Sequence, residues 1–270
     1  MRALPPRAAD SHKGNFGSVA IVGGDSGMLG AVLLAARAAL LCGAGRTYAM
    51  FLASGAPAVD PCHPEIMIRS ASTLTNLAQL SCIVIGPGLG QSKTAIDLLA
   101  LCLAHPVSLL LDADALNLIS QHPHLALALQ QRQAASVITP HPAEAARLLK
   151  TTVENIQANR QQSTLDLARK FGVTSVLKGA GTICADNDGN WFINTTGNAG
   201  LASGGTGDVL SGIIASLIAQ GLGVLEAAKL GIYVHGAAAD KLVADGIGPI
   251  GLTASEVAQE ARKQINQLSQ

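Results

Sequence analysis

The segments Lys178-Gly-Ala-Gly-Thr182 and Gly197-Asn-Ala-Gly-Leu-Ala-Ser-Gly-Gly-Thr-Gly-Asp208 are the most informative part of this chain. Their glycines allow backbone N–H groups to gather round an anion without interference from Cβ atoms. The second segment ends where an apolar pattern with helical spacing begins, at Val209. A helix N-terminus offers free N–H groups and the positive end of a dipole, so the sequence predicts a phosphate site here, with Asp208 as a potential base beside it.

A plainer interpretation of the same segment stays open. Glycine-rich turns commonly precede helices, and aspartate is a favoured residue at a helix start. The segment is not a P-loop, because no G-x-x-x-x-G-K-[ST] pattern occurs and Lys178 lies upstream of the loop. Lys178 itself either binds a nucleotide phosphate or extends to solvent. A phosphate site beside one carboxylate suggests phosphoryl transfer.

Composition limits the classes of function. The 270 residues are 49% hydrophobic and only 13% charged, which suits one large α/β domain, residues 1–270, with residues 1–10 as an N-terminal arm. Lys and Arg number 18, as do Asp and Glu, so no basic field would attract nucleic acid or a membrane. Five cysteines without a C-x-x-C pair indicate free thiols, and no signal peptide is visible. We therefore expect a soluble cytoplasmic protein.

Short apolar runs alternate with helical patterns along the chain, which predicts a mainly parallel sheet covered by helices on both faces. The expected strands are 18–22, 46–51, 82–85, 107–111, 136–138 and 175–177, with a hairpin formed by 182–185 and 191–193. The expected helices are 30–43, 92–104, 143–149, 164–171, 209–218, 226–242 and 255–268, with a short helix starting at 116–119. Functional loops in such sheets lie beyond the carboxyl ends of the strands.

Several polar or glycine-rich segments fall at those strand ends. Asp112 and Asp114 follow one strand and could hold Mg²⁺ through water, although Asp114 equally suits a helix N-cap. His141 and Glu144 would face the same way on a helix beginning near Pro142. Because two prolines flank His141, a substrate contact is favoured for it, whereas Glu144 could simply support the helix dipole.

Together these segments resemble the ADP- or ATP-dependent NAD(P)H-hydrate dehydratases. The resemblance rests on the two opening segments and on Ser11-His-Lys-Gly-Asn-Phe-Gly17, Gly86-Pro-Gly-Leu-Gly90, Asp112-Ala-Asp-Ala-Leu-Asn117 and Thr139-Pro-His-Pro-Ala-Glu144. It implies a ribokinase-like three-layer α/β/α sandwich with a mainly parallel central sheet. It also implies a lyase that repairs the 6S hydrate of NADH or NADPH. The ring hydroxyl is phosphorylated, and loss of the phosphate restores the cofactor.

The resemblance also implies roles for particular residues. Asp208 would be the catalytic base. The nucleotide would be bound by Lys178, Gly179, Ala180, Gly181, Thr182, Gly205, Thr206 and Gly207. The hydrated cofactor would contact Ala31, Gly88, Gly90, His141 and Asp208. ADP or ATP would donate the phosphoryl group with Mg²⁺, whose protein ligands stay unknown beyond the candidates Asp112 and Asp114.

Two properties of the family concern assembly. The resemblance implies a homo-oligomer, namely a tetramer. Many members are fused to an N-terminal epimerase domain, which we do not expect in this chain because only about ten residues precede the first matching motif, at Ser11.

Two other functions fit the same elements. A kinase of this fold acting on a vitamin precursor would use the Gly-Thr-Gly-Asp element equally well, and would release a stable phosphoester. A non-catalytic nucleotide sensor is disfavoured by Asp208, because a sensor has no need of a base. The sequence leaves open the choices between ADP and ATP, and between the NADH and NADPH hydrates.

Overall fold

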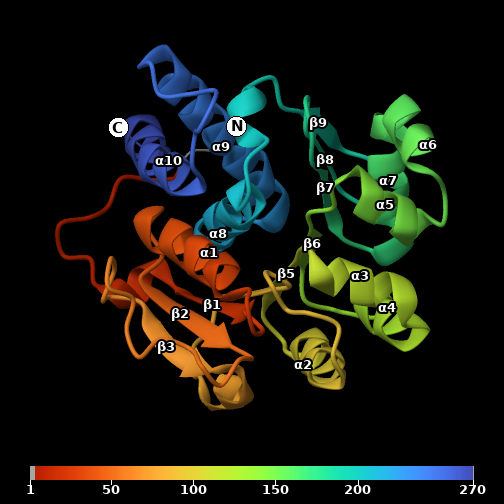
Figure 1. Cartoon of the computed structure of the whole chain (residues 1–270), viewed down its shortest axis with the longest axis horizontal. Helices are drawn as coiled ribbons and strands as arrows, with labels where there is room; N and C mark the ends of the chain where they lie inside the picture. Colours follow the sequence, from red (N-terminus) through yellow and green to blue (C-terminus); the bar gives the residue numbers. More distant parts are fainter. Residues whose placement is uncertain (1–3, 270) are drawn as a thin grey trace.

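The structure, a computed structural model, describes residues 4–269 and is built round a nine-stranded sheet (Figure 1). The strands lie in the order β3-β2-β1-β4-β5-β6-β7-β8-β9. Every pair from β3 across to β7 is parallel, and only β8 and β9 are added antiparallel. The bounds are β1 (Ser18–Gly23), β2 (Arg46–Phe51), β3 (Met67–Ser70), β4 (Cys82–Ile85), β5 (Ser108–Leu111), β6 (Ser136–Ile138), β7 (Thr174–Leu177), β8 (Ile183–Ala185) and β9 (Trp191–Ile193).

Helices cover both faces of this sheet. One face carries α1 (Leu29–Leu41), α8 (Thr206–Ala219), α9 (Val224–Ala244) and α10 (Ala254–Leu268). The other carries α2 (Lys93–Ala104), α3 (Asp114–Gln121), α4 (Pro123–Gln130), α5 (Pro142–Leu149), α6 (Val153–Ala158) and α7 (Arg160–Phe171). Short 3-10 helices are η1 (Lys13–Phe16), η2 (Ala71–Asn76) and η3 (Ala199–Leu201). The result is the three-layer α/β/α sandwich.

Alternation along the strands creates two apolar cores. In β1, Val19 and Ile21 join the core under α1 and α8, whereas Ala20 and Val22 join the core on the opposite face. Successive side chains of a strand point to opposite faces, so a strand covered on both sides must be apolar throughout. All six residues of β1 are buried, which explains its uninterrupted apolar sequence.

Helix α8 is fixed in the middle of one core. Every residue from Val209 to Ala219 is buried. It lies very close to α1, because a Cβ atom at Gly212 would come within 2.1 Å of the carbonyl oxygen of Ala35. Only glycine permits that approach, and the backbone of α8 is therefore held rigidly against its neighbour. This matters because the N-terminus of α8 carries the residues singled out by the sequence.

The predicted fold is confirmed, and most strands and helices lie within two residues of their expected positions. The helix expected at 164–171 begins earlier, at Arg160, because its first turn is polar and gives no apolar signal. Strand β3 and helices α4 and α6 were not predicted. β3 is a half-exposed edge strand, and α4 begins with a proline and no side-chain cap.

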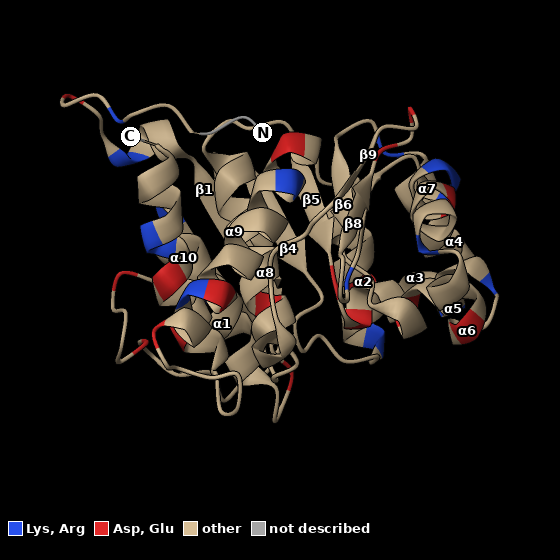
Figure 2. Cartoon of the chain, turned by 90° about the horizontal axis from the view of Figure 1, so that it is seen from above, with Lys and Arg blue, Asp and Glu red and all other residues tan. Residues whose placement is uncertain are grey.

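The surface of the described residues carries charges of both signs, spread over the outer helices and loops (Figure 2). The N-terminal arm packs on the body of the protein: the Arg7 guanidinium stacks 3.6 Å from the centroid of the Phe16 ring and donates a hydrogen bond to the carbonyl of Gly43. Residues 1–3 of that arm lie outside the described residues. Among residues 4–269, no helix combines the length and apolar character that a membrane crossing demands.

Candidate active site

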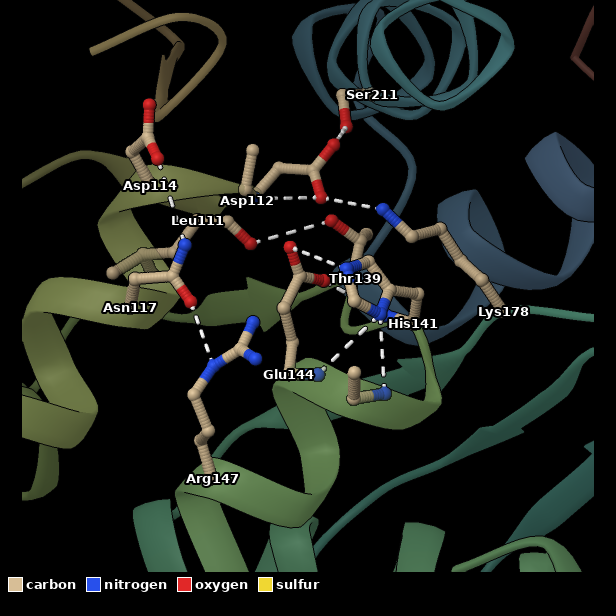
Figure 3. A network of polar contacts seen from close by, with 12 residues as sticks. Leu111, Asp112, Asp114, Asn117, Thr139, His141, Glu144, Arg147, Lys178 and Ser211 are labelled. Atoms are coloured by element: carbon tan, nitrogen blue, oxygen red, sulfur yellow. Dashed lines mark hydrogen bonds and ion pairs between the residues drawn. The ribbon is translucent and has the colours of Figure 1, made fainter. Parts of the chain in front are cut away.

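A buried ion pair lies where the carboxyl ends of β5 and β7 approach α8 (Figure 3). Lys178 Nζ is 2.7 Å from Oδ1 of Asp112, a side chain with only 2% of its surface exposed. The second oxygen, Oδ2, accepts a hydrogen bond of 2.8 Å from the hydroxyl of Ser211, on α8. Asp112 therefore joins two strands of the sheet to α8 and fixes the direction of the Lys178 side chain.

The charge of Lys178 is maintained by its neighbours. Burial favours the neutral amine and so acts to lower the pKa of Lys178. The carboxylates of Asp112, Glu144 and Asp208 act in the opposite direction and prevail, so the pKa of Lys178 lies above its usual value. The ammonium group is a fixed positive charge, and it lies 3.5 Å from where a Cβ atom would stand at Gly207. It is placed to meet a phosphate at the start of α8.

The start of α8 has the form of an anion site. Gly205 precedes the helix with φ of 86°, a conformation that favours glycine, and a Cβ there would collide with Leu34 of α1. The hydroxyl of Thr206 donates to the carbonyl oxygens of Leu201 and Ser203, at 2.8 and 2.9 Å, and closes the turn. The first N–H groups of a helix have no partner within the helix; in α8 the N–H of Thr206 makes a long hydrogen bond of 3.5 Å to the carbonyl oxygen of Ser203, and those of Gly207 and Asp208 remain available for an anion.

Asp208 lies in the first turn of α8 and has the properties of a general base. In the part of the chain that the structure describes, no protein group hydrogen-bonds its carboxylate. Burial raises the pKa of Asp208 to about 7, with a further contribution from the negative charge of Asp112, while Lys178 opposes the shift. A carboxylate with a pKa near neutrality accepts a proton readily and releases it again.

His141 is held in place by Glu144. Its Nδ1 accepts hydrogen bonds from the backbone N–H groups of Ala143 and Glu144, at 3.1 and 3.4 Å, which caps α5. Because Nδ1 accepts, Nε2 carries the proton, and it lies 3.3 Å from Oε1 of Glu144. The pKa of His141 is lowered by burial and by the nearby cation of Lys178. The Nε2–Oε1 contact is an ion-pair distance without hydrogen-bond geometry, so His141 can offer a ligand both its half-exposed ring and the N–H of Nε2.

Glu144 supports this loop from inside the protein. It is 4% exposed, and its Oε2 accepts a 2.8 Å hydrogen bond from the backbone N–H of His141. Burial raises the pKa of Glu144 to about 7, Asp112 adds to the rise, and Lys178 opposes it. The structure thus places Glu144 as a capping carboxylate that orients His141, which agrees with the first-turn role considered from the sequence.

The other predicted substrate residues have neighbours on α1 and α3 and in the loops that precede these helices. The backbone N–H of Gly90 donates a 2.9 Å hydrogen bond to Oδ2 of Asp114. Gly88 lies against Met28, whose carbonyl also accepts a hydrogen bond from the N–H of Ala31. Ala31 is one turn before Leu34 on α1, the residue that touches Gly205. Of these residues, Ala31 is thus connected through α1 to the start of α8, and the contacts of Ala31, Gly88 and Gly90 with the hydrated cofactor stay predictions.

A cavity of about 650 Å³ lies beside the same helix end. It is lined by every predicted nucleotide residue except Gly205, namely Lys178, Gly179, Ala180, Gly181, Thr182, Thr206 and Gly207. Its remaining wall was not predicted and consists of residues 193–199 together with Leu201, Ala202, Leu210, Ile232, His235 and Gly236. None of the predicted substrate residues lines it. The cavity therefore brings together the predicted nucleotide residues and leaves out the predicted substrate residues.

The candidate metal ligands are already engaged. Both oxygens of Asp112 accept hydrogen bonds from protein groups, and Asp114 accepts from the N–H of Gly90. Within residues 4–269, no three His, Cys, Asp or Glu side chains are grouped so that they could hold a metal ion. These residues do not form a magnesium cage, which agrees with the tendency of Mg²⁺ to bind through phosphates and water. A water-mediated role for Asp112 or Asp114 stays a prediction.

Comparison with known proteins identifies the family. A family model for NAD(P)H-hydrate dehydratase matches residues 19–263. The chain is 45% identical over 271 aligned residues to the ADP-dependent (S)-NAD(P)H-hydrate dehydratase of Neisseria meningitidis, covering 97% of this chain and 90% of that protein. The chain belongs to the NAD(P)H-hydrate dehydratase family. The family prediction made from the sequence is therefore confirmed.

Two further comparisons show how the length and the fold of this chain relate to those of other family members. It is 40% identical to a bifunctional NAD(P)H-hydrate repair enzyme of Coxiella burnetii, of which it covers 53%, so it spans about half the length of that relative. The solved structure of the ADP/ATP-dependent NAD(P)H-hydrate dehydratase from Bacillus subtilis, co-crystallised with ATP and Mg²⁺, superposes with a TM-score of 0.86 at 31% identity. That match covers 98% of this chain and 95% of the Bacillus chain. The roles of individual residues stay predictions.

The raised pKa of Asp208 predicts a pH-dependent stability. A carboxyl whose native pKa of about 7 exceeds its usual 3.8 stabilises the fold fully below the usual value, and that stabilisation is lost as pH rises through 7. Between pH 4 and pH 8 the unfolding free energy of the wild type should fall, and that of Asp208→Asn should fall less. The difference between the two decreases should be on the order of 2 kcal/mol. Urea denaturation at several pH values measures this. Asp97→Asn, at an exposed carboxylate of α2, is the control. Identical profiles for wild type and Asp208→Asn would contradict the shifted pKa.

Proposed function

We propose that this chain dehydrates the 6S hydrate of NADH and NADPH at the expense of ADP or ATP. The observation that carries the proposal is the position of Asp208. Its carboxylate, with a pKa of about 7, lies in the first turn of α8 and senses the charges of Asp112 and Lys178, and two other residues of that turn, Thr206 and Gly207, line the cavity together with Lys178–Thr182. The substrate class in this proposal is that of the family relatives, and the geometry supports transfer of a phosphoryl group from a nucleotide to that substrate.

The chemistry requires a better leaving group than hydroxide. Asp208 accepts the proton of the ring hydroxyl while that oxygen attacks the terminal phosphorus of the nucleotide. The bond between this phosphorus and the bridging oxygen breaks, and AMP leaves from ADP, or ADP from ATP. The ring carbon–oxygen bond then breaks with phosphate as the leaving group. Loss of a proton from the neighbouring ring carbon restores the double bond of the reduced nicotinamide.

Charge stabilisation comes from two sources in this chain. The proposal uses backbone N–H groups of Gly205, Thr206 and Gly207, at the start of α8, to stabilise negative charge on the transferring phosphoryl group, and the N–H of Thr206 would exchange its long 3.5 Å bond to Ser203 for the phosphate. Lys178 adds a cation at the same place, and Asp112 keeps that side chain aimed. Phosphoryl transfer depends mainly on such positioning and charge stabilisation. Mg²⁺, arriving with the nucleotide, would supply further charge neutralisation on the phosphates.

The loop Lys178–Thr182 is shaped for the nucleotide by Arg160. Nη2 of Arg160 donates to the carbonyl oxygens of Leu177, Lys178 and Gly181, at 3.1, 3.3 and 3.4 Å. These carbonyls are thereby turned toward α7. A peptide N–H points away from its carbonyl, and the N–H of Lys178 donates to the carbonyl oxygen of Pro140, so the N–H groups of Gly179 and Thr182 are the ones that this arrangement turns away from Arg160. The proposal uses these groups to bind the nucleotide.

We further propose a homotetramer in the cytoplasm. The apolar side chains Trp191 and Ile193 on the edge strand β9 are 47% and 46% exposed, which supports association between copies. All five cysteines are free, and four of them are buried, which suits a reducing compartment.

The decisive experiment follows the reduced nicotinamide absorbance after hydrated NADH is mixed with the protein, Mg²⁺ and ADP or ATP. Absorbance should return, with AMP or ADP and phosphate as co-products. Asp208→Asn should lower kcat by about 10²–10⁴ without changing the dissociation constant of ADP measured by calorimetry. Asp97→Asn serves as the control. A stable phosphoester in place of the absorbance would indicate a kinase, and near-normal turnover in Asp208→Asn would rule out its role as base.

Gly207→Val should abolish nucleotide binding. Gly207 has an ordinary helical conformation, and its Cβ would stand 3.5 Å from Lys178 Nζ, so valine occupies the space where a phosphate approaches. Calorimetry with MgADP measures the loss. Gly223→Val is the control, because Gly223 is likewise a glycine at a helix start, the N-cap of α9, and a Cβ atom added to it would meet nothing within 4 Å. Unchanged ADP affinity in Gly207→Val would contradict the placement of a nucleotide phosphate at the start of α8.

His141→Asn should raise KM for the hydrate and leave ADP affinity unchanged. Asparagine is a good N-cap, so the substitution keeps the start of α5 while removing the imidazole ring. Loss of a contact made equally in ground and transition states raises KM alone. His122→Asn, at the N-cap of α4, is the control. A fall in ADP affinity with normal hydrate KM would place His141 on the nucleotide side of the site.

A further inference from the structure

His235 is a buried histidine that the proposed reaction leaves unused. It lies on α9 and is 8% exposed. Its Nε2 is 3.0 Å from the backbone carbonyl oxygen of Thr206, the first residue of α8. A carbonyl oxygen can only accept, so Nε2 carries the proton of the neutral ring. The other ring nitrogen, Nδ1, is then left with a free lone pair.

That lone pair opens into the nucleotide cavity. His235 lines the cavity, and in residues 4–269 no group hydrogen-bonds its Nδ1. Three polar side-chain atoms of these residues are buried away from solvent and have no hydrogen-bond partner. Nδ1 of His235 is not among them, so it is not sealed from solvent. Because His235 lines the cavity, we assign the open space beside Nδ1 to it. An acceptor of fixed direction is thus built into the cavity wall.

The surroundings keep this acceptor uncharged and effective. Burial lowers the pKa of His235 to about 4, although the bond to Thr206 acts to raise it, and Lys178 adds to the lowering. Leu210 and Ile232 line the cavity along with it. In such apolar surroundings a hydrogen bond is strong, and an acceptor left unpaired by a ligand is costly.

Nδ1 of His235, a neutral acceptor, cannot form a hydrogen bond with a phosphate oxygen. Phosphate oxygens are themselves acceptors, and their place is at Lys178 and the start of α8. The ligand group facing His235 must instead donate a hydrogen bond. In an adenine nucleotide, the donors outside the phosphates are the ribose hydroxyls and the amino group of the base.

We propose that Nδ1 of His235 accepts a hydrogen bond from the nucleoside part of ADP or ATP, and so makes a donor at that position a condition of tight binding. The inference rests on the proposed function, because it assumes that the cavity holds the nucleotide. It assigns His235 a specificity role in addition to its support of Thr206. Both roles use one ring, with one nitrogen directed to the protein and the other to the ligand.

The test combines nucleotide analogues with variants. Dissociation constants are measured by calorimetry for ADP, 2′-deoxy-ADP, 3′-deoxy-ADP and purine riboside diphosphate, which lacks the amino group. One analogue should bind the wild type about 3- to 10-fold more weakly than ADP, and its identity distinguishes ribose from base. In His235→Phe that analogue and ADP should bind equally. His235→Gln, which retains a donor and an acceptor, should recover part of the discrimination.

A purely structural role would give another pattern. If His235 only supports Thr206, His235→Phe weakens all four nucleotides by the same factor and the ratio between them stays that of the wild type, which overturns the inference. Equal binding of all four nucleotides to the wild type overturns it as well, even if His235→Phe fails to fold. The discrimination should also be the same at pH 6 and pH 8, because the ring is neutral throughout this range. His124→Phe, at an exposed histidine of α4, is the control.

The outcomes separate this inference from the proposed function. Absence of ADP binding to the wild type would contradict the nucleotide site itself. Normal ADP binding that is lost in Gly207→Val, together with an unchanged analogue ratio in His235→Phe, would leave the site in place and contradict only the role of His235.

Discussion

The ion pair of Asp112 and Lys178 is the interaction on which the site depends. Two charges withdrawn from water are costly unless each is paired and hydrogen-bonded, and Asp112 meets that condition through Lys178 and Ser211. The geometry is possible only if β5, β7 and α8 are packed in one arrangement. The pair therefore links the fold to the chemistry: the same contact that joins the sheet to α8 also directs a cation to the place where a phosphate would lie.

Burial and the charges of this pair set the pKa values of the two neighbouring carboxyl groups. Asp208 and Glu144 are both displaced to a pKa of about 7 mainly by burial, and the negative charge of Asp112 contributes to each. Their hydrogen bonding makes them different. Glu144 is bound to His141 and is enclosed, so it orients a loop. Asp208 has no such partner in the described chain and is free to exchange a proton with a ligand.

Much of this arrangement can be predicted from the sequence, because its signals are local. Glycine-rich turns after apolar strands marked Lys178–Thr182 and Gly204–Gly207, and the structure brings both to one cavity. Arg160 and His235 gave no such signal. Arg160 lies in a polar helical turn, and His235 sits in the middle of α9. Tertiary packing alone brings them to the site.

The predicted metal role illustrates another limit of sequence. Asp112 and Asp114 are close in the chain and follow a strand, a pattern typical of magnesium ligands. The pattern does not reveal that Lys178 and Ser211 approach Asp112 from distant parts of the chain, or that Gly90 donates to Asp114. Whether a carboxylate is available to a metal depends on these long-range donors.

The predicted nucleotide residues line a cavity that none of the predicted substrate residues enters, and this has a kinetic consequence for the proposed reaction. The cavity beside Lys178 and Gly207 includes neither His141 nor Gly90, so a ligand in one region leaves the other open. Neither ligand has to leave before the other arrives, and direct transfer needs no phosphorylated protein. An enzyme built in this way would form a ternary complex, and its double-reciprocal plots would intersect instead of running parallel.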